Sequence, residues 1–247
     1  MKKEIQNVFG CIEYSLADNT VTGEVVDLMC NYIMDQEVPA AALSVYPSNV
    51  EVAGMALGES PVRISAFCGA YPVGHSYLEV KLLECAMAIE NGADEIEIMV
   101  DLASAIGGNY DALRAEIEAI KSEIAGEALL KVCVACELFD DQDQIYDITM
   151  AAIEAGADFI VATTAFDDAP SLPMMDAVLC AIKDYHSHTG VRVGLKFNLT
   201  TIELQKHGDD LLDLVKNVLG FEWFIPSLMR LDATNMLSYE PDEEVVN

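Results

Sequence analysis

Basic residues are scarce in this sequence. Its 247 residues include 13 Lys and Arg against 42 Asp and Glu, so the formal net charge is −29. A chain this acidic repels nucleic-acid phosphates and anionic lipid headgroups, which argues strongly against binding nucleic acid by neutralising phosphates and disfavours anionic membrane surfaces. We therefore expect neither nucleic acid nor membrane among its partners.

Cysteine is also sparse, and long uncharged runs are missing. Seven Cys in 247 residues are too few for a disulfide scaffold, and the odd number leaves at least one thiol unpaired. Every stretch long enough to cross a membrane contains charged residues, and the first seven residues have no apolar signal-peptide core. These absences predict a soluble, cytoplasmic protein.

Hydrophobic residues, by contrast, make up 52% of the chain, which is enough for a large core. No linker rich in Pro, Gly or Ser interrupts it. We predict one domain over residues 1–247, with an acidic, solvated tail at about 239–247.

Short β-branched and apolar runs alternate with helical patterns along the whole chain. Eight candidate strands can be read from the sequence: Cys11–Leu16, Ala40–Tyr46, Val62–Cys68, Asp94–Val100, Leu129–Leu138, Ala157–Thr164, Arg192–Phe197 and Glu222–Ser227. Helix-length connections imply parallel pairing through right-handed crossovers. Eight such strands in this length predict a single closed (β/α)₈ barrel. An open doubly wound sheet is the alternative, but the glycine-rich dinucleotide turn it often carries is absent.

The segments between the strands have helical period. In residues 111–121, Leu113, Ile117 and Ile120 share one face, while charged residues solvate the other. Residues 77–91 behave likewise, and Asn91-Gly92 is a helix stop directly before a strand.

Three candidate strands carry a charge where a strand covered on both faces should be apolar. Glu97, Lys131 and Lys196 each lie between apolar neighbours. An isolated buried charge costs several kcal/mol, so each needs a partner or a shifted pKa. One interpretation is that the three form a buried ion network in the barrel centre. We favour the alternative that they converge on the C-terminal mouth, where barrel enzymes do their chemistry.

Two other features are weaker. Cys133 and Cys136 form a CxxC that we place inside a strand, where they are expected to be core cysteines. His186 and His188 lie in a polar stretch with no ligand-spaced partner, so no metal site is predicted.

Six segments of the chain match one family in order and spacing. They are Val80–Glu84, Asn91–Met99, Gly108–Ile117, Leu130–Val132, Ala155–Ile160 and Val193–Lys196. Over nearly its whole length the chain resembles deoxyribose-phosphate aldolase. The resemblance implies a (β/α)₈ carbon–carbon lyase with no metal or other cofactor, a small aldehyde or sugar-phosphate substrate, and a homo-oligomer such as a dimer. In the family a lysine on the sixth strand forms a Schiff base with acetaldehyde and adds it to glyceraldehyde 3-phosphate.

The catalytic residues implied by the resemblance are only partly kept. Lys196 matches the seventh-strand lysine, Lys131 the fifth-strand lysine, and Glu97 stands where the family has an aspartate. The Schiff-base lysine is replaced by Val161, which cannot form an imine.

The phosphate cradle implied by the resemblance is also altered. Where the family has the glycines of this cradle, this chain has Ala165, Asn198-Leu199-Thr200 and Phe224–Ser227. Without glycine the backbone loses its close approach to an anion. The remaining candidates for substrate or phosphate binding are Thr163, Thr164, Asn198, Thr200, Ser227 and Arg230.

Two functions follow from these departures. One is a divergent aldolase that uses Lys196 as nucleophile, with Lys131 lowering its pKa and Glu97 moving protons. The other is a non-catalytic barrel that binds a small metabolite or a partner protein. In either case the acidic composition and the lost glycines favour a ligand less anionic than a sugar phosphate.

Overall fold

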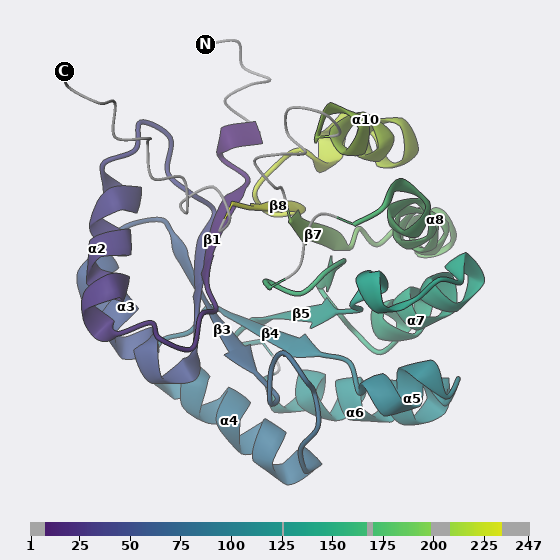
Figure 1. The fold of residues 1–247 in the computed structure, drawn as a ribbon, viewed down its shortest axis with the longest axis horizontal. Helices are drawn as coiled ribbons and strands as arrows, with labels where there is room; N and C mark the ends of the chain where they lie inside the picture. The colour runs from purple at the N-terminus through teal and green to yellow at the C-terminus, as the bar shows by residue number, and fades with distance from the viewer. Residues whose placement is uncertain (1–7, 125, 167–169, 199–207, 234–247) are drawn as a thin grey trace, which may run out of the picture.

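Eight parallel strands close into a barrel, each hydrogen-bonded to its neighbours in chain order, and β8 pairs back onto β1. The computed structural model describes residues 8–124, 126–166, 170–198 and 208–233. Figure 1 shows the strands at the centre and the helices packed around them. The predicted single (β/α)₈ barrel is confirmed. The acidic tail expected at 239–247 lies outside the described residues.

The strands and helices alternate along the chain as expected for this fold. The strands are β1 (Ile12–Leu16), β2 (Ala42–Val45), β3 (Arg63–Cys68), β4 (Glu95–Met99), β5 (Leu129–Cys133), β6 (Phe159–Val161), β7 (Gly194–Asn198) and β8 (Met229–Asp232). The α-helices are α2 (Gly23–Met34), α3 (Val50–Leu57), α4 (Leu78–Glu90), α5 (Leu102–Ile106), α6 (Tyr110–Glu123), α7 (Gln142–Glu154), α8 (Leu172–Thr189) and α10 (Gly208–Leu219). Short 3₁₀ turns are η1 (Pro47–Asn49), η2 (Cys136–Leu138) and η3 (Phe221–Trp223).

The helix predictions hold closely. Helix α6 buries Leu113, Ile117 and Ile120 as its periodicity indicated. Helix α4 ends at Glu90, and Gly92 then adopts a positive φ of 105° on the way into β4. Among the described residues, no helix is long and apolar enough to cross a membrane.

Three predicted strands are wrong in extent or position. The sixth, predicted over Ala157–Thr164, covers only Phe159–Val161. The fifth ends at Cys133, because Ala135 turns into the left-handed region (φ 47°) and η2 begins at Cys136. Cys133 and Cys136 are therefore not in one strand, although both are buried free thiols. The eighth strand is not Glu222–Ser227, where η3 and a turn lie instead, but Met229–Asp232. The apolar run around Trp223 fills the core from a 3₁₀ turn, not from a strand.

The two faces of the strands differ in polarity. Side chains that face the helices are apolar, as in the paired row Ile160, Leu195 and Met229. Alternate residues face the barrel axis, and many are polar although buried. They are Glu13, Ser15, Ser44, Ser65, Glu95, Glu97, Lys131, Lys196, Asn198, Arg230 and Asp232. The interior therefore contains three cations and four carboxylates.

Gly194, the first residue of β7, leaves room for an aromatic ring. A Cβ atom at this position would overlap the ring of Phe159, its register partner on β6. We expect Gly194→Ala to lower the free energy of unfolding by about 1–3 kcal/mol, because the buried ring must move. Urea unfolding measures the change. As a control, Gly23→Ala in α2 meets only Val52 at 3.7 Å, and equal destabilisation by both changes would contradict the prediction.

Candidate active site in the barrel interior

Lys196, on β7, is held by carboxylates from three strands. Its Nζ lies 2.6 Å from Glu13 Oε1, 2.9 Å from Glu97 Oε2 and 3.2 Å from Asp232 Oδ2. It also donates to Ser15 Oγ at 3.2 Å. The side chain is only 1% exposed, so these contacts replace its hydration completely.

Lys131 and Arg230 complete the interior network. Lys131 Nζ lies 2.7 Å from Glu13, 3.3 Å from Glu95 and 3.2 Å from Glu97. Arg230 contacts Glu95 Oε1 at 2.6 Å and Glu13 Oε2 at 3.3 Å. Each cation thus reaches carboxylates on strands across the barrel. Glu13 is the shared partner, since it contacts Lys131, Lys196 and Arg230.

The network sets the protonation of its members. Burial alone would raise the pKa of Glu13, but the charges of Lys131, Lys196 and Arg230 outweigh it and hold that pKa well below the usual range. Burial alone would lower the pKa of Lys196, yet the Glu13, Glu97 and Asp232 carboxylates raise it well above its usual value. Lys196 is therefore an ammonium at neutral pH. The depressed pKa required of a nucleophilic Lys196 is the reverse of what its surroundings produce.

Val161 lies at the end of β6, in direct register with Lys196 on β7. It is fully buried, and its other register partner is Cys133 on β5. Burial, together with the nearby Glu137 and Glu97 carboxylates, raises the pKa of the Cys133 thiol well above its usual value, so this thiol stays protonated. The position to which the resemblance assigns the imine lysine is thus filled by a side chain with no nucleophilic atom.

The residues expected to bind a substrate or phosphate do not gather at one end of the barrel. Thr163 and Thr164 follow β6 and are buried, and Asn198 at the end of β7 donates to the Thr164 carbonyl at 2.6 Å. These three lie at the C-terminal mouth. Thr200 lies outside the described residues.

Ser227 and Arg230 are placed differently from the others. Ser227 precedes β8 and lines a cavity at the opposite, N-terminal mouth, and Arg230 turns inward to Glu95. Because β8 begins at Met229, its C-terminal end presents Asp232, paired in register with Asn198. The C-terminal mouth therefore has an acidic side chain on β8 where a serine was expected. Asp232 accepts a hydrogen bond from Ser15 Oγ.

Sequence reasoning missed Glu13, Glu95 and Asp232. The available signal was period-two alternation: residues 12–16 and 95–99 place polar or charged side chains at every second position. This pattern indicates one polar face, which here is the barrel interior. Near the end of α8, His186 is half-buried against the Trp223 ring and His188 is exposed. Among the described residues, no cluster of three His, Cys, Asp or Glu side chains is arranged to hold a metal ion.

The chain is similar in sequence to known aldolases, although no protein-family model matches it. Deoxyribose-phosphate aldolase of Mus musculus is 31% identical over 207 residues, which are 83% of this chain and 64% of that protein. The enzyme of the same name from Mycobacterium tuberculosis is 36% identical over 163 residues, or 65% of this chain and 68% of the relative. The chain thus spans less than two thirds of the length of the mouse protein.

A solved structure shares the fold. The crystal structure of a candidate deoxyribose-phosphate aldolase from Toxoplasma gondii ME49 superposes with a TM-score of 0.81. The match covers 93% of this chain and 90% of that one at 18% identity. At this identity the likeness shows the barrel and its connectivity.

Glu13 makes the free energy of unfolding of the barrel depend on pH. Because the pKa of the Glu13 carboxyl is lower in the folded state, the folded protein binds a proton on Glu13 more weakly than the unfolded chain does. The stability that the Glu13 carboxylate contributes is therefore complete at pH values above its ordinary pKa of 4.5, and it is lost as the pH falls below 4.5. We expect Glu13→Gln to cost about 3–5 kcal/mol at pH 7, because three buried cations lose a partner. The deficit should shrink at about pH 3.5.

Urea unfolding of both proteins at the two pH values measures this deficit. Glu118→Gln, on the exposed face of α6, is the control and should change stability by less than about 0.5 kcal/mol. A Glu13→Gln deficit that is the same at both pH values would show that the carboxylate charge is not what stabilises the barrel.

Proposed function

Because the chain belongs to the deoxyribose-phosphate aldolase family, we propose that it catalyses aldol-type carbon–carbon cleavage or formation on a small sugar or aldehyde without a lysine imine. The observation that supports this proposal is the environment of Lys196: an ammonium held by three carboxylates, beside Val161 in place of a nucleophile. The reaction would take place at the C-terminal mouth.

Aldol cleavage needs a base and a site for the electrons of the broken bond. The base removes the proton of the hydroxyl group β to the carbonyl, the carbon–carbon bond breaks, and its electron pair forms an enolate that is then protonated. A fixed ammonium can stabilise the enolate oxygen, and a neighbouring carboxylate can accept the hydroxyl proton. We assign the first role to Lys196 and the second to Glu97.

Asp232 is the partner of Lys196 that a substrate oxygen would replace. It makes the longest of the three carboxylate contacts, at 3.2 Å, and it ends β8 at the C-terminal mouth. Glu13 and Glu97, at 2.6 and 2.9 Å, would keep the ammonium in place. Lys131 acts as a positioning residue, because it contacts both of these carboxylates.

This proposal predicts turnover that does not pass through a covalent adduct. We expect cleavage of deoxyribose to fall by about 10²–10³-fold in Lys196→Met, as when one oxyanion donor is removed. Acetaldehyde with borohydride should leave Lys196 unmodified, because a protonated amine does not form an imine. An enzymatic assay for released acetaldehyde and mass spectrometry of tryptic peptides measure the two outcomes.

Val161→Lys restores an amine at the lost position, with Val161→Met as the matched control. We expect borohydride to trap an adduct on the introduced lysine and none in the control. An adduct on Lys196 of the unaltered protein, trapped by borohydride reduction, would refute the mechanism without an imine.

A non-catalytic barrel is the second candidate, and the burial of Lys196 favours it. All hydrogen-bond donors of its ammonium are occupied, and the side chain is 1% exposed. If the unaltered protein and Lys196→Met both lack acetaldehyde release, this second function replaces the first.

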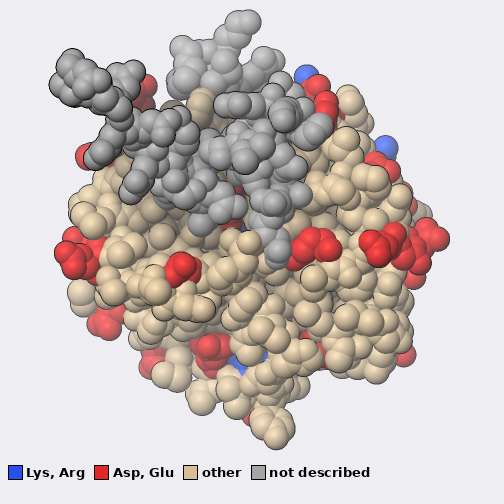
Figure 2. Space-filling view, in the orientation of Figure 1, with Lys and Arg blue, Asp and Glu red and all other residues tan. Residues whose placement is uncertain are grey.

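The charges at the C-terminal mouth also favour a less anionic ligand. Asp232 ends β8 there, and on the face drawn in Figure 2 the Asp and Glu side chains outnumber Lys and Arg. We expect deoxyribose to bind more tightly than deoxyribose 5-phosphate, and Asp232→Asn to reduce the difference, because a dianion is repelled by this carboxylate. Equilibrium binding at low ionic strength checks both expectations, and tighter binding of the phosphate would refute them. A cytoplasmic location and a homo-oligomer stay predictions.

A further inference from the structure

A cavity of about 470 Å³ opens at the N-terminal mouth of the barrel. Its walls come from the segments that precede four strands, including Gly10 before β1, Ala41 before β2, Pro61 before β3 and Pro226 before β8. It is therefore at the opposite end of the barrel from the C-terminal mouth.

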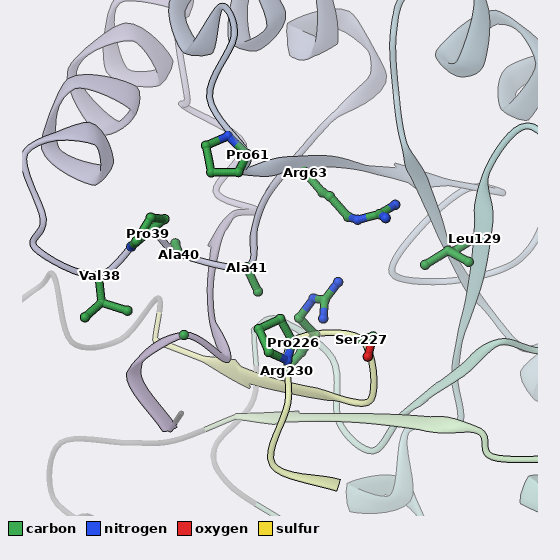
Figure 3. Close-up of a pocket in the computed structure, with 11 residues that line it drawn as sticks. Val38, Pro39, Ala40, Ala41, Pro61, Arg63, Leu129, Pro226, Ser227 and Arg230 are labelled. Carbon is green, nitrogen blue, oxygen red and sulfur yellow. The ribbon is translucent and has the colours of Figure 1, made fainter. Parts of the chain in front are cut away.

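Positive charge gathers in this cavity. The sequence has four arginines, and two of them, Arg63 and Arg230, line it. In Figure 3 these side chains extend from β3 and β8 toward the middle of the cavity. No acidic side chain is among the described residues that line it. Arg230 is already paired with Glu95 and Glu13, so Arg63 carries the positive charge that a ligand can reach.

Arg63 has hydrogen-bonding capacity left for a ligand. Its nearest carboxylate is Glu95, whose Oε1 lies 3.9 Å from Arg63 Nε, too far for a hydrogen bond. The same Glu95 oxygen accepts from Arg230 at 2.6 Å. The side chain of Arg63 is 50% exposed. A ligand can therefore engage Arg63 without breaking the buried Glu95–Arg230 pair.

The rest of the wall is apolar and rigid. Three of the eight prolines in the chain, Pro39, Pro61 and Pro226, form part of it, together with Ala41 and Leu129. Proline fixes its own φ angle, so these positions lose little conformational freedom when a ligand binds. The Ser227 hydroxyl at the edge adds a hydrogen-bond donor.

We propose that this cavity is a binding site for a small organic carboxylate with an apolar body. The carboxylate lies on Arg63, whose planar guanidinium can donate two parallel hydrogen bonds, while Arg230 behind it stays paired with Glu95 and Glu13. The apolar body packs on the prolines and Leu129. The site is separate from the proposed reaction centre, so its occupancy can be measured whether or not the protein is a lyase.

Calorimetric titration of the full chain with benzoate and with benzamide tests this proposal, because the two probes match in shape and differ in charge. We expect benzoate to bind at least about tenfold more tightly than benzamide. Arg63→Gln should weaken benzoate binding by about tenfold or more, and Arg63→Lys should fall between them, because a charge remains but the paired donors are lost.

Arg192→Gln is the matched control, since Arg192 is an exposed arginine outside the cavity that lies over the Trp223 ring. It should bind benzoate as the unaltered protein does. Equal affinity for benzoate and benzamide, undiminished binding by Arg63→Gln and Arg63→Lys, or no benzoate binding at millimolar concentration would each overturn the proposal.

Discussion

The contact of Glu13 with three cations is the interaction on which the rest of the barrel depends. Removing a carboxylate and its partners from water costs several kcal/mol per ion, and only close, complete pairing offsets that cost. Here Lys131, Lys196 and Arg230 approach one side chain from three strands. The barrel therefore requires all of these strands in one register. A shift by one residue would turn the charges outward into the apolar layer beneath the helices.

The same contacts decide what chemistry Lys196 can perform. A lysine nucleophile has to lose its proton, and nearby carboxylates oppose that loss. In this interior the cation contributes to the ion network that supports the fold, so making it a neutral amine would weaken the network. A lysine at position 161 would have to be a neutral amine in order to form an imine. With Val161 there, no amine beside Lys196 has to be kept neutral. The replacement of the imine lysine and the high pKa of Lys196 are thus two aspects of one electrostatic arrangement.

Much of this architecture could be predicted from the sequence, and the exceptions have a common physical cause. Helix faces such as Leu113, Ile117 and Ile120 were readable because a surface helix has one apolar side. The last strand was misplaced because residues 222–227 contain an apolar run, whereas the real β8 alternates Met229, Arg230, Leu231 and Asp232. A search for strands that are apolar on both faces does not find a strand in which every second residue is charged. The pairing of carboxylates with cations was also unreadable, since it joins residues as distant in the chain as Glu13 and Lys196.

The two ends of the barrel differ in charge because the network is not symmetric along its axis. Toward the N-terminal mouth, Arg63 and Arg230 share the Glu95 carboxylate. Toward the C-terminal mouth, Lys196 is shared by Glu97 and Asp232 in addition to Glu13. The excess of cations at one end and of carboxylates at the other follows from which strand residues face inward. We therefore expect an anion to bind more readily at the N-terminal mouth than at the C-terminal mouth. Asp232 at the end of β8 supports this expectation, because it is a third carboxylate beside the single Lys196 ammonium.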